Sequence, residues 1–192
     1  MKNINKNKII IATGGTGGHI FPAYSLGKNF INNSYIVEII TDKRGLKYLD
    51  KHNDIKLILN KSATIFKKNI LNVFFSIFII FLSYIKSLVI LYKAKPMVVF
   101  GMGGHASFPV CLAARTLNIP FIIYENNIQI GKSNKYLLPF AFKIFVSYQD
   151  ILGVKNKYEH KVIVTGNIIR EEIFSFKKNN FFSKDILNIL VL

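Results

Sequence analysis

The sequence alternates between short, mostly apolar runs and longer segments of mixed polarity. The apolar runs are rich in Ile, Val and Phe and are bounded by Gly, Pro, Asn or Lys. Runs of this kind are typical of strands in a parallel sheet that is covered on both faces. The predicted strands are Ile9–Ala12, Tyr35–Thr41, Ile55–Leu59, Met97–Phe100, Ile119–Tyr124, Lys143–Ser147 and Lys161–Thr165.

Helical patterns lie between these runs. A helix is predicted from about Phe21 to Phe30, with Pro22 in its first turn, where proline is tolerated. A short helix is predicted around Gly45–Lys51, and another ends near Leu117. Strands that alternate with helices predict an α/β fold, a Rossmann-like doubly wound parallel sheet.

The character of the chain changes after residue 175. Residues 1–175 hold the predicted elements and form the expected N-terminal domain. Phe176–Lys184 is polar, basic and aromatic, which is typical of a linker, and Ile186–Leu192 is an apolar, strand-like run. We therefore expect residues 176–192 to be a linker and the first strand of a second domain that these 192 residues do not complete.

One apolar segment is long enough to raise the question of a membrane. Asn69–Ile85 contains 17 consecutive uncharged residues, rich in Phe, Ile and Leu, with lysines on both sides. This length is at the lower limit for a membrane-spanning helix. Its place between the third and fourth strands predicts a crossover helix instead. A helix in the membrane interface, with its apolar face in lipid and its lysines at anionic headgroups, stays open as an alternative.

Composition narrows the classes of partner. The chain has 26 Lys+Arg against 10 Asp+Glu, a net charge of +16. Such a charge attracts nucleic acid, anionic lipid or phosphorylated substrates, although a bias toward Lys, Asn, Ile and Phe explains it equally well. No nucleic-acid motif is present, so we expect no nucleic-acid partner. The single cysteine, Cys111, excludes a disulfide framework, and the four histidines lack metal-ligand spacing, so no metal or other cofactor is expected.

Two glycine-rich turns each follow a predicted strand and open a helix. Gly14–His19 follows the first strand and Gly101–His105 follows the fourth. Glycine lets the backbone approach a ligand closely, and the free N–H groups at a helix start attract an anion. Turns after strands one and four would flank the crevice at the switch point of a doubly wound sheet. This predicts a phosphate or diphosphate pocket, with tight structural turns as the simpler alternative.

The first turn does not match the common nucleotide motifs. It lacks the Gly-Lys-Ser/Thr of a P-loop, and Ile20 stands where the third glycine of a dinucleotide fingerprint is expected. Asp42, at the end of the second strand, leaves dinucleotide binding as a weak alternative.

His19 is the candidate catalytic base. An imidazole titrates near neutrality, and a helix N-terminus favours its neutral, proton-accepting form. A histidine that only caps or packs is the alternative. Glu125, Asn127 and Arg170 follow later strands and are expected at the same edge of the sheet, where Asn127 binds a sugar or caps a turn.

Several motifs in order resemble the bacterial lipid II-forming N-acetylglucosaminyltransferases. The resemblance rests on the two glycine turns, with Phe21-Pro22-Ala23 after the first. It continues through Glu125-Asn126-Asn127, Gly131-Lys132-Ser133-Asn134 and Gly166-Asn167-Ile168-Ile169-Arg170.

The resemblance implies the N-terminal half of a two-domain GT-B glycosyltransferase of peptidoglycan synthesis. Such enzymes transfer N-acetylglucosamine from UDP-N-acetylglucosamine to the undecaprenyl-diphosphate-linked acceptor lipid I, with inversion and without a required metal. They act at the cytoplasmic face of the bacterial inner membrane, where an anionic membrane surface is a further expected partner. By motif, the implied substrate-binding residues are Thr16, Gly17, Gly18, Gly103, Gly104, Glu125, Asn127 and Arg170, and the implied base is His19.

Two functions therefore stand side by side. In the first, the chain is the acceptor half of the enzyme and is inactive without a donor domain. In the second, it is a non-catalytic, membrane-associated subunit that binds the acceptor and recruits a separate donor-domain chain.

Overall fold

The computed structural model describes residues 5–49, 53–61 and 70–169. The predicted linker and second-domain strand at 176–192, and the candidate site residue Arg170, lie outside the described residues. The predicted boundary after residue 175 therefore stays a prediction.

The described residues form one seven-stranded parallel sheet in the order β3-β2-β1-β4-β5-β6-β7. The order reverses between β1 and β4, so these two strands flank the switch point. This confirms the predicted Rossmann-like doubly wound fold. The strands are β1 Asn5–Ala12, β2 Ile36–Thr41, β3 Lys56–Leu59, β4 Pro96–Gly101, β5 Phe121–Glu125, β6 Lys143–Val146 and β7 Val162–Val164.

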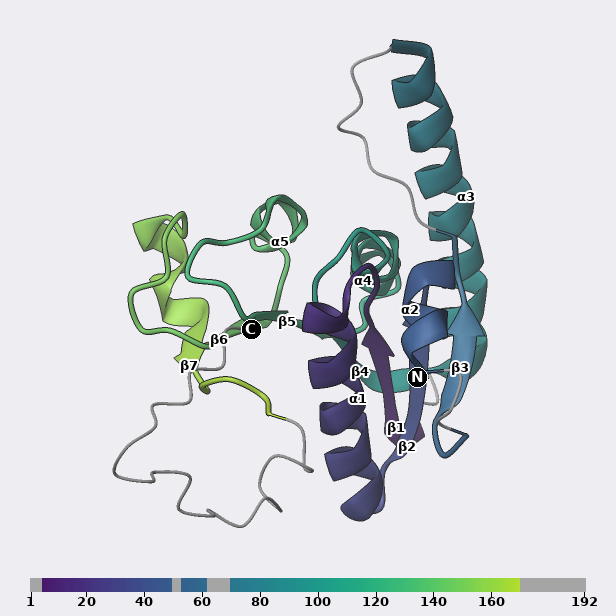
Figure 1. Ribbon diagram of the computed structural model, residues 1–192, viewed down its shortest axis with the longest axis horizontal. Coiled ribbons are helices and arrows are strands. Elements are labelled where there is room, and N and C mark those ends of the chain that lie inside the picture. Colours follow the sequence, from purple (N-terminus) through teal and green to yellow (C-terminus); the bar gives the residue numbers. More distant parts are fainter. Residues whose placement is uncertain (1–4, 50–52, 62–69, 170–192) are drawn as a thin grey trace, which may run out of the picture.

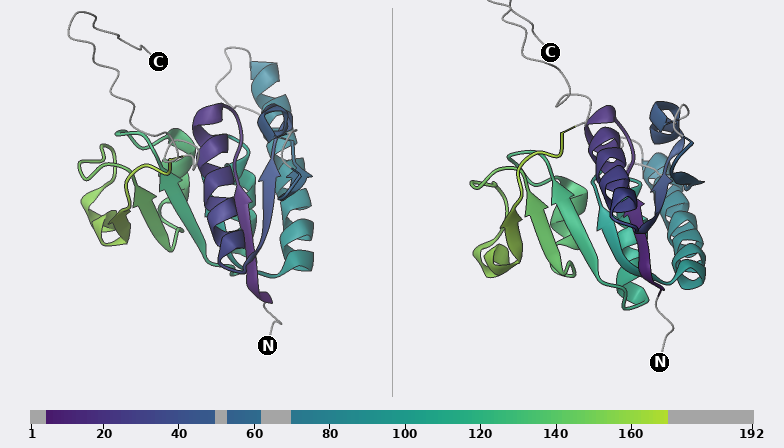
Figure 2. Two further views of the ribbon diagram at one scale, coloured as in Figure 1. Left: turned by 60° about the horizontal axis from the view of Figure 1, so that its bottom comes forward. Right: turned by 90° about the horizontal axis from the view of Figure 1, so that it is seen from below.

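Helices cover both faces of the sheet (Figures 1 and 2). One apolar layer joins α1 and α2 to the sheet through Ile20, Ala23 and Leu49. The other joins α3, α4 and α5 through Leu91, Val110 and Leu137. The helices are α1 Gly17–Asn32, α2 Lys43–Leu49, α3 Ile70–Ala94, α4 Ser107–Thr116 and α5 Lys132–Leu137, with a 3₁₀ helix at Asn156–Lys161.

The predicted start of the first helix differs from the structure, and the difference affects the candidate base His19. Helix α1 begins at Gly17, not near Phe21, so His19 lies inside the helix. The low helix propensity of glycine hides this start in the sequence. Pro22 consequently stands beyond the first turn that the sequence predicted for it. Helix α5 and the 3₁₀ helix were not predicted, because both are short and polar.

Helix α3 is the predicted crossover between β3 and β4. It turns small serine side chains toward the protein and large apolar side chains outward. The face toward the protein carries the buried small side chains Ser76, Ser83 and Ser87. Asn60, after β3, donates to the Ser83 carbonyl (3.2 Å) and to Oγ of Ser87 (2.9 Å). The N-terminal part of α3 projects beyond the sheet at its carboxyl edge (Figure 1). The outward face is apolar. Its exposed side chains are Phe74, Phe75, Ile77, Phe78, Phe81, Leu82, Ile85, Val89 and Tyr92.

Candidate active site at the carboxyl edge of the sheet

The two glycine turns meet beside the switch point. The N–H of Met102, after β4, donates to the carbonyl of Ala12 at the end of β1 (2.8 Å). Gly103 and Gly104 have positive φ, +88° and +77°, a region that favours glycine. A Cβ on Gly104 would collide with the backbone of Gly14, so the turns are in direct contact. The turns that the sequence predicted to flank one crevice are therefore adjacent.

His19 is the third residue of α1 and stands between both turns. Its backbone N–H donates to the Thr16 carbonyl (3.1 Å), and Oγ1 of Thr13 donates to the backbone carbonyl of His19 (3.1 Å). A Cβ on Gly103 would lie 2.8 Å from ring atoms Cε1 and Nδ1 of His19, so a glycine is needed there. The ring also hydrogen-bonds with the backbone of Met102. The first two bonds hold the backbone of His19, and the Met102 bond and the close approach of Gly103 place its ring.

Burial is the main cause that lowers the pKa of His19 below its ordinary value of 6.5. The neighbouring His105 lowers this pKa further, while the charge of Glu125 and the Met102 hydrogen bond raise it. The sequence predicted the same direction from the helix N-terminus alone. A neutral imidazole that donates one ring N–H to a carbonyl keeps its other nitrogen as a proton acceptor.

The start of α1 presents unused polar groups. Thr16 is the N-cap residue, yet its side chain makes no capping hydrogen bond, although an N-cap hydroxyl normally accepts from the first turn. A Cβ on Gly18 would find Oγ1 of Thr16 as its nearest atom, 3.9 Å away, so the space above Gly18 is open. Gly17 differs, because a Cβ there would lie 2.9 Å from the ring of Phe21.

Glu125, at the end of β5, organises the loop that follows. It is 2% exposed, and its Oε1 accepts from the backbone and side-chain nitrogens of Asn127 (3.1 and 2.8 Å). Its Oε2 accepts from the Gly131 N–H (2.8 Å) and from Nδ2 of Asn134 (2.9 Å). Four donors thus hold this carboxylate, and the Asn127 amide that bonds to it belongs to a residue that lines the cavity. This geometry favours a positioning role for Glu125.

Asn126 is a site residue that the sequence analysis did not single out. Its Nδ2 donates to the carbonyl of Gly18 (3.0 Å). That carbonyl lacks its usual helix partner, because residue i+4 is Pro22, which has no N–H. The sequence held one sign of this contact: Pro22 follows Gly18 by four residues, so the Gly18 carbonyl needs a partner from outside the helix. The contact ties the end of β5 to the start of α1.

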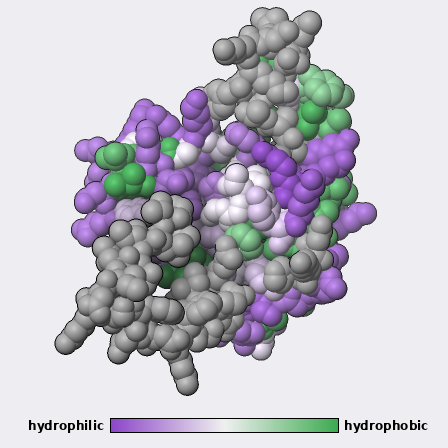
Figure 3. All heavy atoms as spheres, in the orientation of Figure 1, coloured by the Kyte–Doolittle hydropathy of each residue, from purple (hydrophilic) through white to green (hydrophobic). Residues whose placement is uncertain are grey.

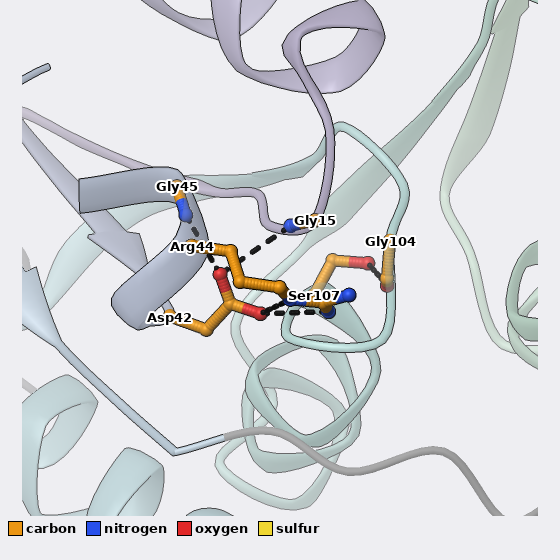
Figure 4. Close-up of polar contacts among 6 residues, drawn as sticks. All are labelled: Gly15, Asp42, Arg44, Gly45, Gly104 and Ser107. Atoms are coloured by element: carbon orange, nitrogen blue, oxygen red, sulfur yellow. Dashed lines mark hydrogen bonds and ion pairs between the residues drawn. The ribbon is translucent and has the colours of Figure 1, made fainter. Parts of the chain in front are cut away.

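Asp42 serves the protein rather than a ribose. The Asp42 residue is 4% exposed, and its Oδ1 accepts from the backbone N–H groups of Gly45 (2.9 Å) and Gly15 (3.4 Å). Its Oδ2 accepts from Nε and Nη2 of Arg44 (3.2 and 3.0 Å) (Figure 4). A carboxylate engaged in this way is not free to bind a ribose hydroxyl. This argues against the dinucleotide alternative.

One open cavity of about 270 Å³ lies between the second glycine turn, His19 and the loop after β5, and Thr16, Gly17, Gly18, Asp42 and Asn126 are not part of its lining. This volume is smaller than the roughly 300–1,000 Å³ of sites that bury a drug-sized ligand. No group of three or more His, Cys, Asp or Glu side chains within residues 5–49, 53–61 and 70–169 is placed to hold a metal ion. The cavity lining includes His19, Gly103, Gly104, His105, Glu125 and Asn127.

Comparisons with known proteins agree with this fold. Residues 9–146 match the glycosyltransferase family 28 N-terminal domain. A Rickettsia prowazekii protein is 40% identical over 86% of this chain and 42% of its own length. It is named UDP-N-acetylglucosamine–N-acetylmuramyl-(pentapeptide) pyrophosphoryl-undecaprenol N-acetylglucosamine transferase. Its Rickettsia canadensis counterpart is 38% identical over 86% of this chain and 46% of its own length.

Solved structures show the same fold at lower identity. Acinetobacter baumannii MurG has a TM-score of 0.68 and 23% identity over 83% of this chain and 45% of its own. Neisseria meningitidis UDP-GlcNAc 2-epimerase bound to UDP-GlcNAc has a TM-score of 0.60 and 19% identity over 84% of this chain and 47% of its own. The chain spans less than half the length of each of these relatives. It belongs to glycosyltransferase family 28, whose N-terminal domain it carries in residues 9–146.

Proposed function

We propose that this chain is the acceptor-binding half of a transferase that moves N-acetylglucosamine from UDP-N-acetylglucosamine to lipid I, forming lipid II. The observation that carries the proposal is the placement of a partly buried imidazole between two touching glycine turns. The turns offer backbone N–H groups to a diphosphate, and the imidazole offers a base beside it. The names of the Rickettsia relatives supply the substrates.

In this reaction His19 takes the proton from the acceptor 4-hydroxyl as its oxygen attacks the anomeric carbon of the donor sugar. The bond from that carbon to the diphosphate oxygen breaks, UDP leaves with the electron pair, and the configuration inverts. Thr16, Gly17, Gly18, Gly103 and Gly104 line the acceptor side. Asn127, oriented by Glu125, and Arg170 contact the donor.

Membrane contact through α3 is part of the proposal. Within the described residues, Val73–Ala94 is the one helix long and apolar enough to cross a membrane. Both of its ends connect to strands of the same sheet, which favours a helix that lies along a membrane surface. Figure 3 shows apolar side chains along the margin where α3 lies. The apolar part of α3 projects at the edge that carries the site, as a lipid-linked acceptor requires (Figure 1). The expected location is the cytoplasmic face of the inner membrane.

A transfer assay tests the proposal directly. The 192 residues are fused to the donor half of the R. prowazekii relative and supplied with lipid I and radiolabelled UDP-N-acetylglucosamine. We expect labelled lipid II from the fusion and none from the 192 residues alone, because the relatives' second half is not included. A folded fusion that binds lipid I without transferring sugar would contradict the proposal and favour the non-catalytic acceptor-binding subunit. Transfer by the 192 residues alone would show that the donor half is dispensable.

A further inference from the structure

Arg44 is an exposed cation that is nevertheless held in one position. Its side chain is 59% exposed, while the Asp42 side chain that binds it is 6% exposed. Both Nε and Nη2 donate to the same Asp42 oxygen, at 3.2 and 3.0 Å. A long side chain at a surface usually loses entropy when it is fixed, so an anchored arginine is already organised for binding.

The anchoring pair leaves the outer edge of the guanidinium available. Arginine has five N–H donors in a fixed fork, and the bonds to Asp42 use two of them. The remaining donors are the two on Nη1 and one on Nη2. Among the described residues no further acceptor takes a hydrogen bond from Arg44. This pair of nitrogens matches two oxygens of a phosphate group.

The position of Arg44 connects it to the glycine turns. A Cβ on Gly15 would have Nη2 of Arg44 as its nearest atom, at 3.9 Å, so the guanidinium lies over the first turn. The same Asp42 that holds Arg44 also accepts from the Gly15 N–H (3.4 Å). On the second turn, burial and then the Arg44 charge lower the pKa of His105, which lines the site cavity. Arg44 therefore stands close to both turns, as Figure 4 shows for Gly15 and Gly104.

We propose that Arg44 binds the diphosphate of the lipid-linked acceptor at the joint of the two glycine turns, and that Asp42 is its positioning residue. The inference rests on the proposed function and adds an anchored side-chain cation to the backbone N–H groups of the two turns. The diphosphate carries several charged oxygens, which backbone groups alone neutralise only in part. Asp42 fixes the first turn and the cation with one carboxylate, so both are presented together.

Binding measurements on the 192-residue chain test the assignment. Farnesyl diphosphate serves as the acceptor-like probe and UDP as the donor-like probe, in calorimetric titrations at constant salt. Arg44→Gln should weaken farnesyl diphosphate binding by roughly tenfold or more, since a hydrogen-bonded charge is lost. Arg44→Lys should recover only part of it, because an ammonium lacks the fork. Arg115→Gln is the matched control, since Arg115 lies in α4 and contacts the ring of Phe140 instead.

Asp42→Asn separates positioning from a purely structural role. It keeps the size of the side chain but removes the charge that holds Arg44, so farnesyl diphosphate affinity should fall while the guanidinium is still present. In the Arg44→Gln background the same change should cost little further affinity. A melting temperature recorded for each variant identifies any that fail to fold, and the Arg44 variants change only an exposed side chain.

Four results would overturn the inference. Equal farnesyl diphosphate affinity for wild type and Arg44→Gln would do so, and so would a loss as large in Arg115→Gln, which would indicate general charge attraction. Weakened UDP binding with unchanged farnesyl diphosphate binding would place Arg44 on the donor side. Absence of diphosphate binding by the wild type also overturns it. None of these results decides the proposed function, which the transfer assay of the fusion reports separately.

Discussion

At the scale of the residue, the environment of His19 suits the role of proton acceptor proposed for it. Its type and its place after a glycine turn identify it in the sequence. The structure adds the burial that lowers its pKa, the Met102 hydrogen bond that occupies one ring nitrogen, and the glycine at 103 that gives the ring its room. A histidine placed in this way is held ready to accept a proton at neutral pH.

In the fusion with a donor half, His19→Ala should lower kcat by about 10²–10⁴-fold, the usual size of general-base catalysis. KM for lipid I should change much less, because the turns bind the diphosphate. The measurement is steady-state transfer with the melting temperature recorded in parallel. A stable variant with near-normal kcat would remove His19 as the base, and a variant that only melts earlier would indicate a packing residue.

Substitutions at Gly18 and Gly104 test two different reasons for a glycine. At Gly18 we expect the reason to be space for a ligand, and at Gly104 the backbone conformation and packing of the fold. Gly18→Ala places a methyl group in open space within a helix, where alanine is the better helix former. The melting temperature should stay unchanged or rise, while binding of farnesyl diphosphate weakens. Gly104→Ala is the contrast: positive φ and the backbone of Gly14 oppose a side chain, so stability should fall by about 1 kcal/mol or more. Unchanged diphosphate binding by Gly18→Ala would show that no ligand uses that space.

At the scale of the element, α3 has one face that packs on the sheet and one that faces outward. Its serine face and Leu91 attach it to the sheet, and Nζ of Lys86 donates to the carbonyl of Leu59 (2.7 Å). Its outward face exposes Phe74 and Phe75 by 67% and 61%. Large apolar side chains gathered on one exposed face indicate an interaction surface. Lys93, in the last turn of α3, suits a surface that carries anionic lipid.

Phe78→Glu should reduce co-sedimentation with anionic phospholipid vesicles without lowering the melting temperature. Phe78 is 56% exposed, so the change removes apolar contact with lipid and adds repulsion, with little loss of packing. Ile36→Glu is the matched control, because the substitution introduces the same charge at a similarly exposed position. Ile36 is 54% exposed and lies at the start of β2, far from α3 in sequence. Equal loss for both variants would indicate net charge alone, and no loss for Phe78→Glu would remove α3 as the membrane contact.

At the scale of the whole molecule, two histidines and two carboxylates with lowered pKa values make the free energy of unfolding depend on pH. Burial is the first cause that lowers the pKa of both His19 and His105 below 6.5. The pKa values of Glu38 and Asp54 are also lowered, against the effect of burial, by hydrogen bonds from Lys56 and Lys28. The carboxylates contribute stability that is lost only in more acidic solution, as pH falls through their lowered values.

The histidines predict a loss of stability that starts near pH 6.5. As pH falls through that value the unfolded chain takes up protons that the folded chain still refuses, so the free energy of unfolding decreases. The decrease continues until the lowered folded-state pKa values are reached. Urea unfolding at pH 7.5, 6.5 and 5.5 measures it. A His19→Gln, His105→Gln double variant should lose less over this range, and an identical slope would contradict the assignment.

The sequence alone determined the fold class, the neighbouring glycine turns and the crossover helix. Parallel strands read as apolar runs because both faces are buried, and strand–helix alternation leaves few topologies. The turns fall at the switch point because they follow strands one and four, which is a matter of chain order. His19 and Asn127, which line the cavity, were candidates because they stand beside these signals.

Only the tertiary structure decided how the site is assembled, since its decisive contacts join residues far apart in the chain. The Asn126 bond to Gly18 spans 108 residues, and the Gly15 bond to Asp42 spans 27. The start of α1 was placed late because local propensity disfavours glycine in a helix, whereas packing and backbone bonding hold it there. The sequence left open whether the apolar face of α3 meets the sheet or faces outward, because periodicity gives a helix two faces and only packing decides which one meets the sheet.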